Sequence, residues 1–265
     1  MKNLTQQQKI YYALRLASAM CFIGHGAFGI ITKPIWVNYF DVFGIGHDTA
    51  YHLMPVVGSI DILCGLILLF YPVRAVVVWL VIWGFVTATL RPLSGEPFAE
   101  LIERAGNFGA PLALLLLTGG VGKNIKDFFK PVIPPVQVDE KTFANIKVLL
   151  RAVVFLLLVG HGWLNLIGKK ALLSEYTSLG FSNSTAVAQA VGLFEIMVGL
   201  AVLVRPFRPL LIGLFIWKMA SELFYPHYEI FEWIERGGSY FALLSLWLAI
   251  DKTTSSKTEF AFTIL

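Results

Sequence analysis

The sequence predicts an all-α integral membrane protein of eight transmembrane helices. We expect two parallel four-helix repeats, related by a pseudo-two-fold axis along the membrane normal. Of the 265 residues, 57% are hydrophobic and only 14% are charged, and the mean hydropathy is +0.71. A soluble domain usually carries about 25% charged residues, so lipid must solvate much of this chain. Apolar runs recur along the chain, and motifs of the first half return in the second.

Apolar runs mark the predicted helices in order. They lie at residues 16–32, 54–71, 75–90, 107–121, 149–167, 187–204, 209–223 and 238–250. Several are shorter than the roughly 20 residues that a helix needs to cross the hydrocarbon. We expect amphipathic stretches at 98–106 and 230–237 to lengthen the fourth and eighth helices. Helices are predicted because no run alternates like a strand and because lipid offers backbone groups no hydrogen bonds.

Basic residues indicate the orientation. The first run follows Lys2, Lys9 and Arg15, which would also suit a secretory signal peptide. Its motif recurs in the fifth run, so we interpret it as a structural helix. Most of the 21 basic residues fall in cytoplasmic segments if the N-terminus is cytoplasmic, which satisfies the positive-inside rule. Both termini are therefore predicted to be cytoplasmic.

The charge and cysteine content exclude some functions. The net charge of +4 does not indicate nucleic-acid binding, because the basic residues lie at the ends of apolar runs. Cys21 and Cys64 fall inside predicted helices, where we expect no disulfide.

An internal repeat relates the two halves. The matched positions are Gly24-His25-Gly26 with Gly160-His161-Gly162, Gly58-x-x-Asp61-x-x-x-Gly65 with Gly192-x-x-Glu195-x-x-x-Gly199, Pro72 and Arg74 with Pro206 and Arg208, Trp83 with Trp217, and Glu103-Arg104 with Glu235-Arg236. Each half has an even number of predicted helices, so both halves enter the membrane in the same direction. The predicted organisation is a first repeat at 1–121, a cytoplasmic linker at 122–147, a second repeat at 148–252 and a cytoplasmic tail at 253–265. A short interfacial helix is expected within the linker, near residues 123–130.

Ionisable residues inside predicted helices are candidates for function, because each costs a few kcal/mol in lipid. His25 lies about 15 Å from Arg15 along a helix, and His161 has the same spacing in the fifth helix. Asp61 and Glu195 lie at matching depths in the second and sixth helices. Each histidine can therefore meet the carboxylate of its own half, and we predict His25, Asp61, His161 and Glu195 as catalytic residues. The alternative is that each pair only fastens two helices together.

Small residues surround the predicted acids. Glycines on the same helical face as Asp61 and Glu195 would allow close helix packing or the approach of a flat ring or an isoprenoid headgroup. The predicted ligand-binding residues are Gly58, Gly65, Gly192, Gly199 and Arg91.

Other charged residues are expected to be structural. Lys218 and Glu222 lie one helical turn apart with opposite signs, so we expect them to neutralise each other. We interpret Glu103-Arg104 and Glu235-Arg236 as interfacial charges; the alternative is that they cap an internal lumen.

A stripe along the third predicted helix ends at Arg91. The stripe of Trp79, Trp83, Thr87 and Arg91 is typical of interfacial anchoring and packing rather than of a cofactor wall. Three further histidines lie in predicted outer segments and match no metal-ligand spacing: His47, His52 and His227.

Short motifs give each half a family resemblance. A Gly-His-Gly centre followed by Lys occupies 24–33 and 160–169. Gly-x-x-Asp/Glu-x-x-x-Gly-Leu occupies 58–66 and 192–200, and a Pro-x-Arg turn follows at 72–74 and 206–208. In these features each half resembles the DoxX/DoxD-like membrane protein superfamily over nearly its whole length. A typical member has one four-helix unit, whereas this chain fuses two.

The resemblance implies a role at the respiratory quinone pool of a bacterial cytoplasmic membrane, because some DoxD/DoxA-type proteins belong to thiosulfate:quinone oxidoreductases. Histidine and carboxylate suit this chemistry, since a quinone carbonyl needs a hydrogen-bond donor and its reduction needs protons. The sequence contains no Cys cluster, no Cys-x-x-Cys-His motif and no nucleotide-binding loop. A soluble or membrane redox partner subunit would therefore have to bring electrons, unless haem is present.

Three alternatives remain open at this point. A proton-coupled carrier of a small solute could use the intramembrane acids, although no broken helix is apparent in the sequence. Two equivalent histidines could supply both axial ligands of one haem, or two histidines and two carboxylates could hold a metal pair. The chain could also be an assembly scaffold without a small-molecule site.

Overall fold

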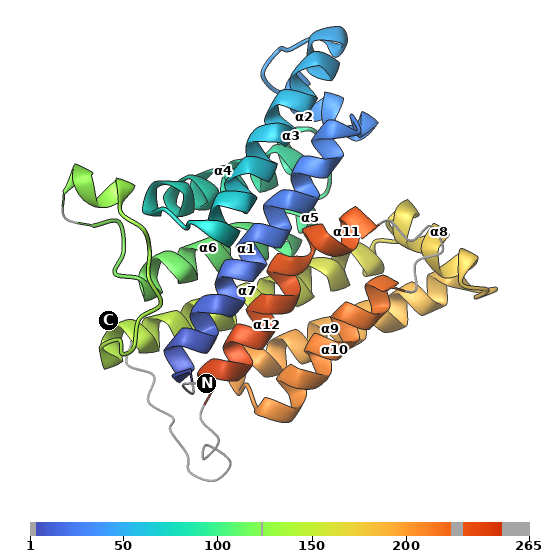
Figure 1. The fold of residues 1–265 in the computed structure, drawn as a ribbon. Coiled ribbons are helices and arrows are strands. Elements are labelled where there is room, and N and C mark those ends of the chain that lie inside the picture. Colours follow the sequence, from blue (N-terminus) through green and yellow to red (C-terminus); the bar gives the residue numbers. More distant parts are fainter. Residues whose placement is uncertain (1–3, 123, 224–229, 251–265) are drawn as a thin grey trace.

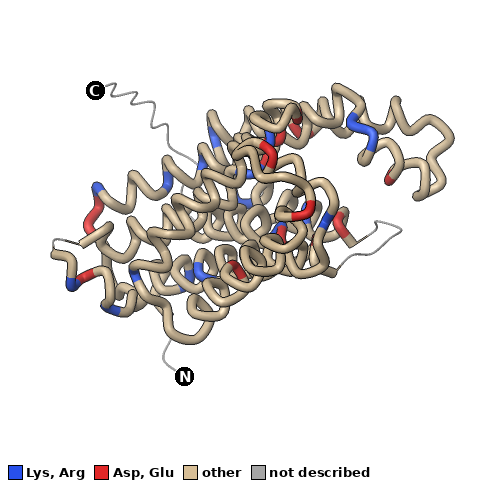
Figure 2. Tube along the Cα trace, turned by 90° about the horizontal axis from the view of Figure 1, so that it is seen from above, with Lys and Arg blue, Asp and Glu red and all other residues tan. Residues whose placement is uncertain are grey.

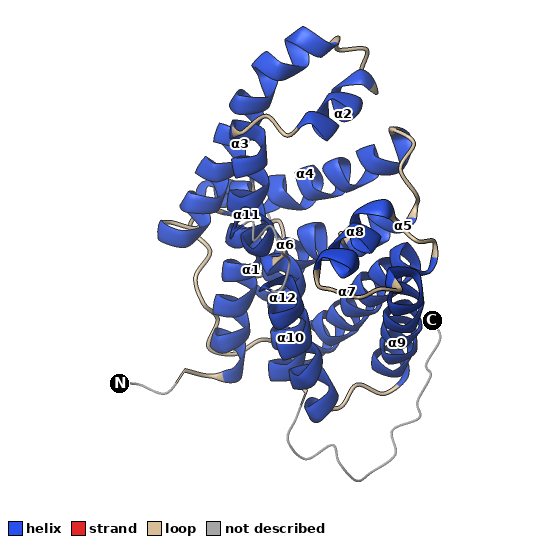
Figure 3. Cartoon of the chain, turned by 90° about the vertical axis from the view of Figure 1, so that its right-hand side faces the viewer, coloured by secondary structure: helices blue, strands red, loops and turns tan. Residues whose placement is uncertain are grey.

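The computed structural model describes residues 4–122, 124–223 and 230–250, and its regular elements within these ranges are all helices (Figures 1 and 3). In chain order they are α1 (Gln6–Ile30), η1 (Pro34–Trp36), α2 (Val37–Asp41), α3 (His47–Phe70), α4 (Arg74–Leu93), α5 (Ala99–Glu103), α6 (Ala105–Leu117), η2 (Ile125–Phe129), α7 (Glu140–Leu166), α8 (Lys170–Ser178), α9 (Ser184–Val204), α10 (Arg208–Leu223), α11 (Ile230–Glu235) and α12 (Gly237–Ala249). The predicted tail at 253–265 and His227 lie outside the described residues.

Five helices of the described chain are long and apolar enough to cross a membrane: α1, α3, α4, α7 and α9. A helix is present at each of the other three apolar runs, but α6, α10 and α12 have only 13, 16 and 13 residues. The chain is therefore a helical protein with the apolar helices of a multi-pass membrane protein.

The stretches that we expected to lengthen the fourth and eighth helices are helical but separate. Arg104 lies between α5 and α6, and Arg236 lies between α11 and α12. The Arg104 amide donates to the carbonyl of Leu101, three residues back, so the chain turns more tightly there than an α-helix does. The sequence showed no broken helix, which argued against a carrier; the structure has breaks at Arg104 and Arg236, so that argument no longer holds.

Local signals set the other helix ends. The Asp139 carboxylate accepts a hydrogen bond from the Thr142 amide at 2.9 Å and caps α7. Helix α7 consequently begins at Glu140, inside the predicted linker and before the predicted boundary at 148. The short helix expected in the linker is the 3₁₀ helix η2.

Helices α1 and α7 hold the fold together, because each packs against elements from both halves. Helix α1 contacts α3 and α6 of its own half and α11 and α12 of the other (Figure 1). Helix α7 contacts α9 and α12 of its own half and α5 and α6 of the other. Charged residues are sparse along the helices, but a group of acidic and basic residues lies among the central helices (Figure 2).

Matched arginines of the two halves make the same contacts. Arg74, at the start of α4, donates to the Thr118 carbonyl just after α6, at 3.0 Å. Arg208, at the start of α10, donates to the Ile250 carbonyl just after α12, at 2.8 Å. Each arginine satisfies a helix-terminal carbonyl that has no partner within its own helix.

Matched glycines bring the halves into contact with each other. A Cβ added at Gly24 would lie 2.3 Å from the backbone nitrogen of Glu235, and a Cβ added at Gly160 would lie 2.3 Å from that of Glu103. Real side chains never come so close, so only glycine permits these crossings. Each half therefore contributes its broken helix to the core of the other half.

Matched lysines join the halves by ion pairs. The Lys33 ammonium lies 3.0 Å from the Glu232 carboxylate, and Lys169 makes the corresponding ion pair with Glu100. Both pairs link the segment after a long central helix to the broken helix of the other half.

Candidate functional site

The first histidine–carboxylate pair joins α1 to α3. His25 Nδ1 lies 2.9 Å from Asp61 Oδ2, and the Asp61 side chain is fully buried. The pair forms because the two helices cross at glycines, where a Cβ at Gly58 would lie 2.4 Å from the Gly26 carbonyl oxygen. The contact that helical spacing suggested is thus present, and its chemical role stays a prediction.

The glycines beside the acids pack helices rather than line a cavity. Gly58 and Gly192 face the backbone of α1 and α7, while a Cβ at Gly65 would lie 2.6 Å from the Ile23 side chain. A Cβ at Gly199 would lie 3.2 Å from the Leu158 side chain. The neighbouring helix occupies the space beside these four glycines, and their role in ligand binding stays a prediction.

A cavity of about 240 Å³ lies beside His25. Its walls are mostly aromatic and aliphatic, and five polar side chains reach it. The apolar lining is Trp36, Tyr39, Phe40, Phe43, Ile45, Val57, Trp83 and Leu90, and the polar lining is His25, Thr87, Arg91, Arg104 and Asn107. The His25 and Trp36 ring centroids are 4.6 Å apart, so the imidazole packs against one wall. Apolar walls with a few convergent polar groups are typical of small-molecule sites.

Three residues of the stripe on α4 line this cavity, and the role of the stripe as an interfacial anchor stays a prediction. Trp83, Thr87 and Arg91 all line the cavity, whereas Trp79 stacks on Trp83 and is 42% exposed. Helix α4 also lies close against α6, since a Cβ at Gly84 would lie 2.7 Å from the Asn107 carbonyl oxygen. Arg91, a predicted ligand contact, therefore lies where a ligand could reach it.

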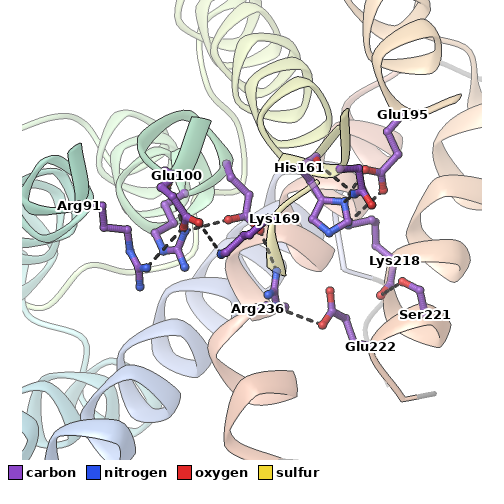
Figure 4. Close-up of polar contacts among 12 residues, drawn as sticks. Arg91, Glu100, His161, Lys169, Glu195, Lys218, Ser221, Glu222 and Arg236 are labelled. Atoms are coloured by element: carbon purple, nitrogen blue, oxygen red, sulfur yellow. Dashed lines mark hydrogen bonds and ion pairs between the residues drawn. The ribbon is translucent and has the colours of Figure 1, made fainter. Parts of the chain in front are cut away.

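The second histidine–carboxylate pair has a third member (Figure 4). His161 Nδ1 contacts Glu195 Oε2, and the Lys218 ammonium donates to Glu195 Oε1 at 3.2 Å. The cavity here is only about 10 Å³, close to the least space that holds a water molecule. Its lining is Glu103, Leu157, His161, Lys218, Glu222, Arg236, Ser239 and Tyr240.

Lys218 and Glu222 form their ion pairs with other residues, which corrects the expectation that they pair with each other. Lys218 pairs with Glu195, and Glu222 Oε2 lies 3.0 Å from Arg236 Nε. Both side chains point into the protein, where tertiary partners are nearer than a neighbour on the same helix. The helical-spacing rule describes exposed helix surfaces and therefore fails here.

The charges at the helix breaks form a buried cluster between the halves, which corrects their assignment to the membrane interface. Glu103 lies 2.8 Å from Arg104 and 2.9 Å from Arg236, and Arg104 also lies 2.6 Å from Glu100. Glu100 is fully buried and further contacts Lys169 (Figure 4). Buried charges need such partners, because desolvation would otherwise be prohibitive.

The described residues contain no group of three or more His, Cys, Asp and Glu side chains that could hold a metal ion. His25 and His161 line different cavities, so the geometry does not favour one haem between them. His47 Nδ1 lies 3.3 Å from the carboxylate of the neighbouring exposed Asp48, and its ring packs against Tyr51 with the ring centroids 4.8 Å apart.

No family model, curated protein or solved structure matches the chain. Its fold and site define it as a helical protein of membrane type with an aromatic-walled pocket beside a histidine–aspartate pair.

Proposed function

We propose that the chain is a quinone-linked redox subunit of a bacterial cytoplasmic membrane and that its first half binds the quinone headgroup. The observation that carries this proposal is the cavity beside His25. Its tryptophan, tyrosine and phenylalanine walls suit a flat apolar ring, and its polar side chains suit the ring carbonyls.

The His25–Asp61 pair suits proton exchange with such a ring. Asp61 engages Nδ1, which leaves Nε2 as the ring nitrogen available to a ligand. A protonated imidazole donates from Nε2 to a quinone carbonyl, and a neutral one accepts from a quinol hydroxyl. The buried Asp61 carboxylate orients the ring. A soluble or membrane redox partner would supply or remove the electrons.

We further propose eight membrane crossings in two parallel DoxX/DoxD-like repeats, with both termini cytoplasmic. The proposed repeats are 1–121 and 148–252, and the last residues of the linker at 122–147 form the start of α7. The matched contacts of Arg74 and Arg208 support this arrangement. So do the reciprocal crossings at Gly24 and Gly160. Each broken segment, α5–α6 and α11–α12, would serve as one crossing.

A second candidate function is proton-coupled transport of a small solute. The breaks at Arg104 and Arg236 favour it, because interrupted helices commonly form the binding sites of transporters. Flux driven by a pH gradient in liposomes would support transport, and its absence would leave the redox function as the better account.

The test is to purify the wild-type chain in mild detergent, extract it for quinone and record its absorption spectrum. We expect co-purifying quinone and no haem absorption. His25→Ala should weaken quinone binding by roughly tenfold to a hundredfold, the usual value of a hydrogen bond to a charged group.

His161→Ala is the matched control, because Glu195 retains Lys218 as a partner. It should keep wild-type quinone occupancy. Full occupancy in the His25→Ala variant would contradict the proposal.

A further inference from the structure

Two residues of α10 have much larger side chains than their counterparts in α4. Trp217 matches Trp83, so Lys218 and Glu222 take the places of Gly84 and Ala88. Gly84 and Ala88 are both buried in α4. The second half thus carries two long charged side chains where the first half carries almost no side chain.

The long side chains fill the second cavity. Its lining includes His161, Arg236 and Ser239, the counterparts of His25, Arg104 and Asn107, which line the first cavity. The Lys218 and Glu222 side chains also line it, and its volume is about 10 Å³ instead of about 240 Å³. Three of the five polar positions of the first cavity therefore recur around a much smaller space. Of the other two counterparts, Ser221 does not line the second cavity, and Tyr225 lies outside the described residues.

The carboxylates of the two histidine pairs, Glu195 and Asp61, differ in their hydrogen-bond partners. Glu195 Oε1 accepts a hydrogen bond from Lys218 at 3.2 Å. The buried Asp61 Oδ1 has no hydrogen-bond partner among the described residues. Lys218 thus supplies a hydrogen-bond donor to the carboxylate of the second half. Gly84, at the matching position of the first half, has no side chain that could do so.

We propose that the halves have specialised: each chain binds one flat-ring ligand, in the first half, and Lys218 and Glu222 close an equivalent second site. The identity of the ligand as a quinone rests on the proposed function, but the number of sites does not. Lys218 and Glu222 thereby determine the stoichiometry of binding.

Lys218 and Glu222 can both be replaced by alanine without leaving a buried charge unpaired, so a variant can be designed to open the second site. Lys218→Ala leaves Glu195 paired with His161, and Glu222→Ala leaves Arg236 paired with Glu103. The double change removes one positive and one negative charge, so the net charge is unchanged. No buried charge loses all of its partners.

The test counts the molecules of 2-naphthol, a flat phenol without a tail, that bind each full-length chain, by native mass spectrometry. We expect one for the wild type and two for Lys218→Ala/Glu222→Ala. The matched control, Lys218→Met/Glu222→Met, removes the same charges but keeps the space filled, so it should bind one. Adding His25→Ala to the opened variant should leave one, bound in the second half.

A wild-type chain that binds none or two would overturn the inference, as would a folded opened variant that still binds one. The unfolding temperature of each variant shows whether it is folded. If the opened variant does not fold, the single variants Lys218→Ala and Lys218→Met are compared instead. More naphthol should bind to Lys218→Ala than to Lys218→Met, and equal binding would overturn the inference. A chain that binds one naphthol but no benzoquinone would reject the proposed function and leave this inference standing.

Discussion

Glu175 is a described carboxylate outside the five helices long enough to cross a membrane, and its surroundings raise its pKa. It lies on the short helix α8, and burial raises its pKa from 4.5 to about 7. The negative charges of Glu222 and Glu232 act in the same direction, while the positive charges of Arg236 and His161 oppose them. The native state therefore keeps a proton on Glu175 at a pH where an unfolded chain has lost it.

The free energy of unfolding should consequently fall as the pH rises from 4.5 to about 7. Between 4.5 and about 7 the native state binds more protons than the unfolded state, so rising pH favours unfolding. Glu175→Gln cannot lose a proton and should flatten this part of the curve. Thermal unfolding in detergent across the pH range measures the slope.

Glu140→Gln, on the exposed first turn of α7, is the control and should leave the slope unchanged. A Glu175→Gln variant with the wild-type slope would show that other groups carry the pH dependence.

Some residues of the site follow from the sequence and others do not. Helical spacing and the repeat indicated that His25 could meet Asp61 and that His161 could meet Glu195, because both rest on position along helices. The partner of Lys218 could not be predicted, since Glu195 on another helix competes with Glu222 on the same one. Which face of a helix turns inward is decided by tertiary packing.

The crossing of α1 with α3 depends on glycine, which gives a prediction for one helix pair. Gly58→Ala would place a Cβ 2.4 Å from the Gly26 carbonyl oxygen, and both atoms belong to rigid helix backbones. The helices must move apart, which should cost about 1–3 kcal/mol of stability. The unfolding temperature of the purified variant is the measurement.

Gly213→Ala in α10 is the matched control, because a Cβ there has nothing within 4 Å. It should be neutral or stabilising by up to about 1 kcal/mol, as expected for removing a helix glycine. Equal effects of the two substitutions would show that the close crossing does not limit stability.

Apolar runs predicted where helices form but not where they break. The runs are visible because burial in lipid or in the core demands them at every turn. The break at Arg104 is not visible in the sequence, because Glu103, Arg104 and Ala105 are compatible with a continuous helix. A tertiary contact lies beside the break: a Cβ at Gly106 would lie 2.9 Å from the Gly238 backbone, so the two broken helices contact each other there.

The repeat indicated two similar halves but not how they fit together. A chain of two separate four-helix units would have kept each broken helix within its own half. The broken helices here pack on both halves: α11 and α12 also contact α1, while α5 and α6 also contact α7. This exchange needs complementary surfaces, such as Gly24 against Glu235, whose partners are far apart in the sequence.

Because the halves interlock, the linker should be dispensable once both are made. We expect residues 1–136 and 137–265, expressed together as two polypeptides, to purify as one complex. The cut falls between Val136 and Gln137, which are both exposed. Pull-down through an affinity tag on one polypeptide measures the association.

Gly24→Leu and Gly160→Leu should abolish this association, because each side chain would meet the backbone of the other half at 2.3 Å. Gly213→Leu, at an exposed position with nothing within 4 Å, should leave it intact. Two polypeptides that fold but purify separately would mean that the linker, and not the exchanged helices, holds the halves together. Association that survives both leucine substitutions would place the binding energy elsewhere, in the ion pairs of Lys33 and Lys169.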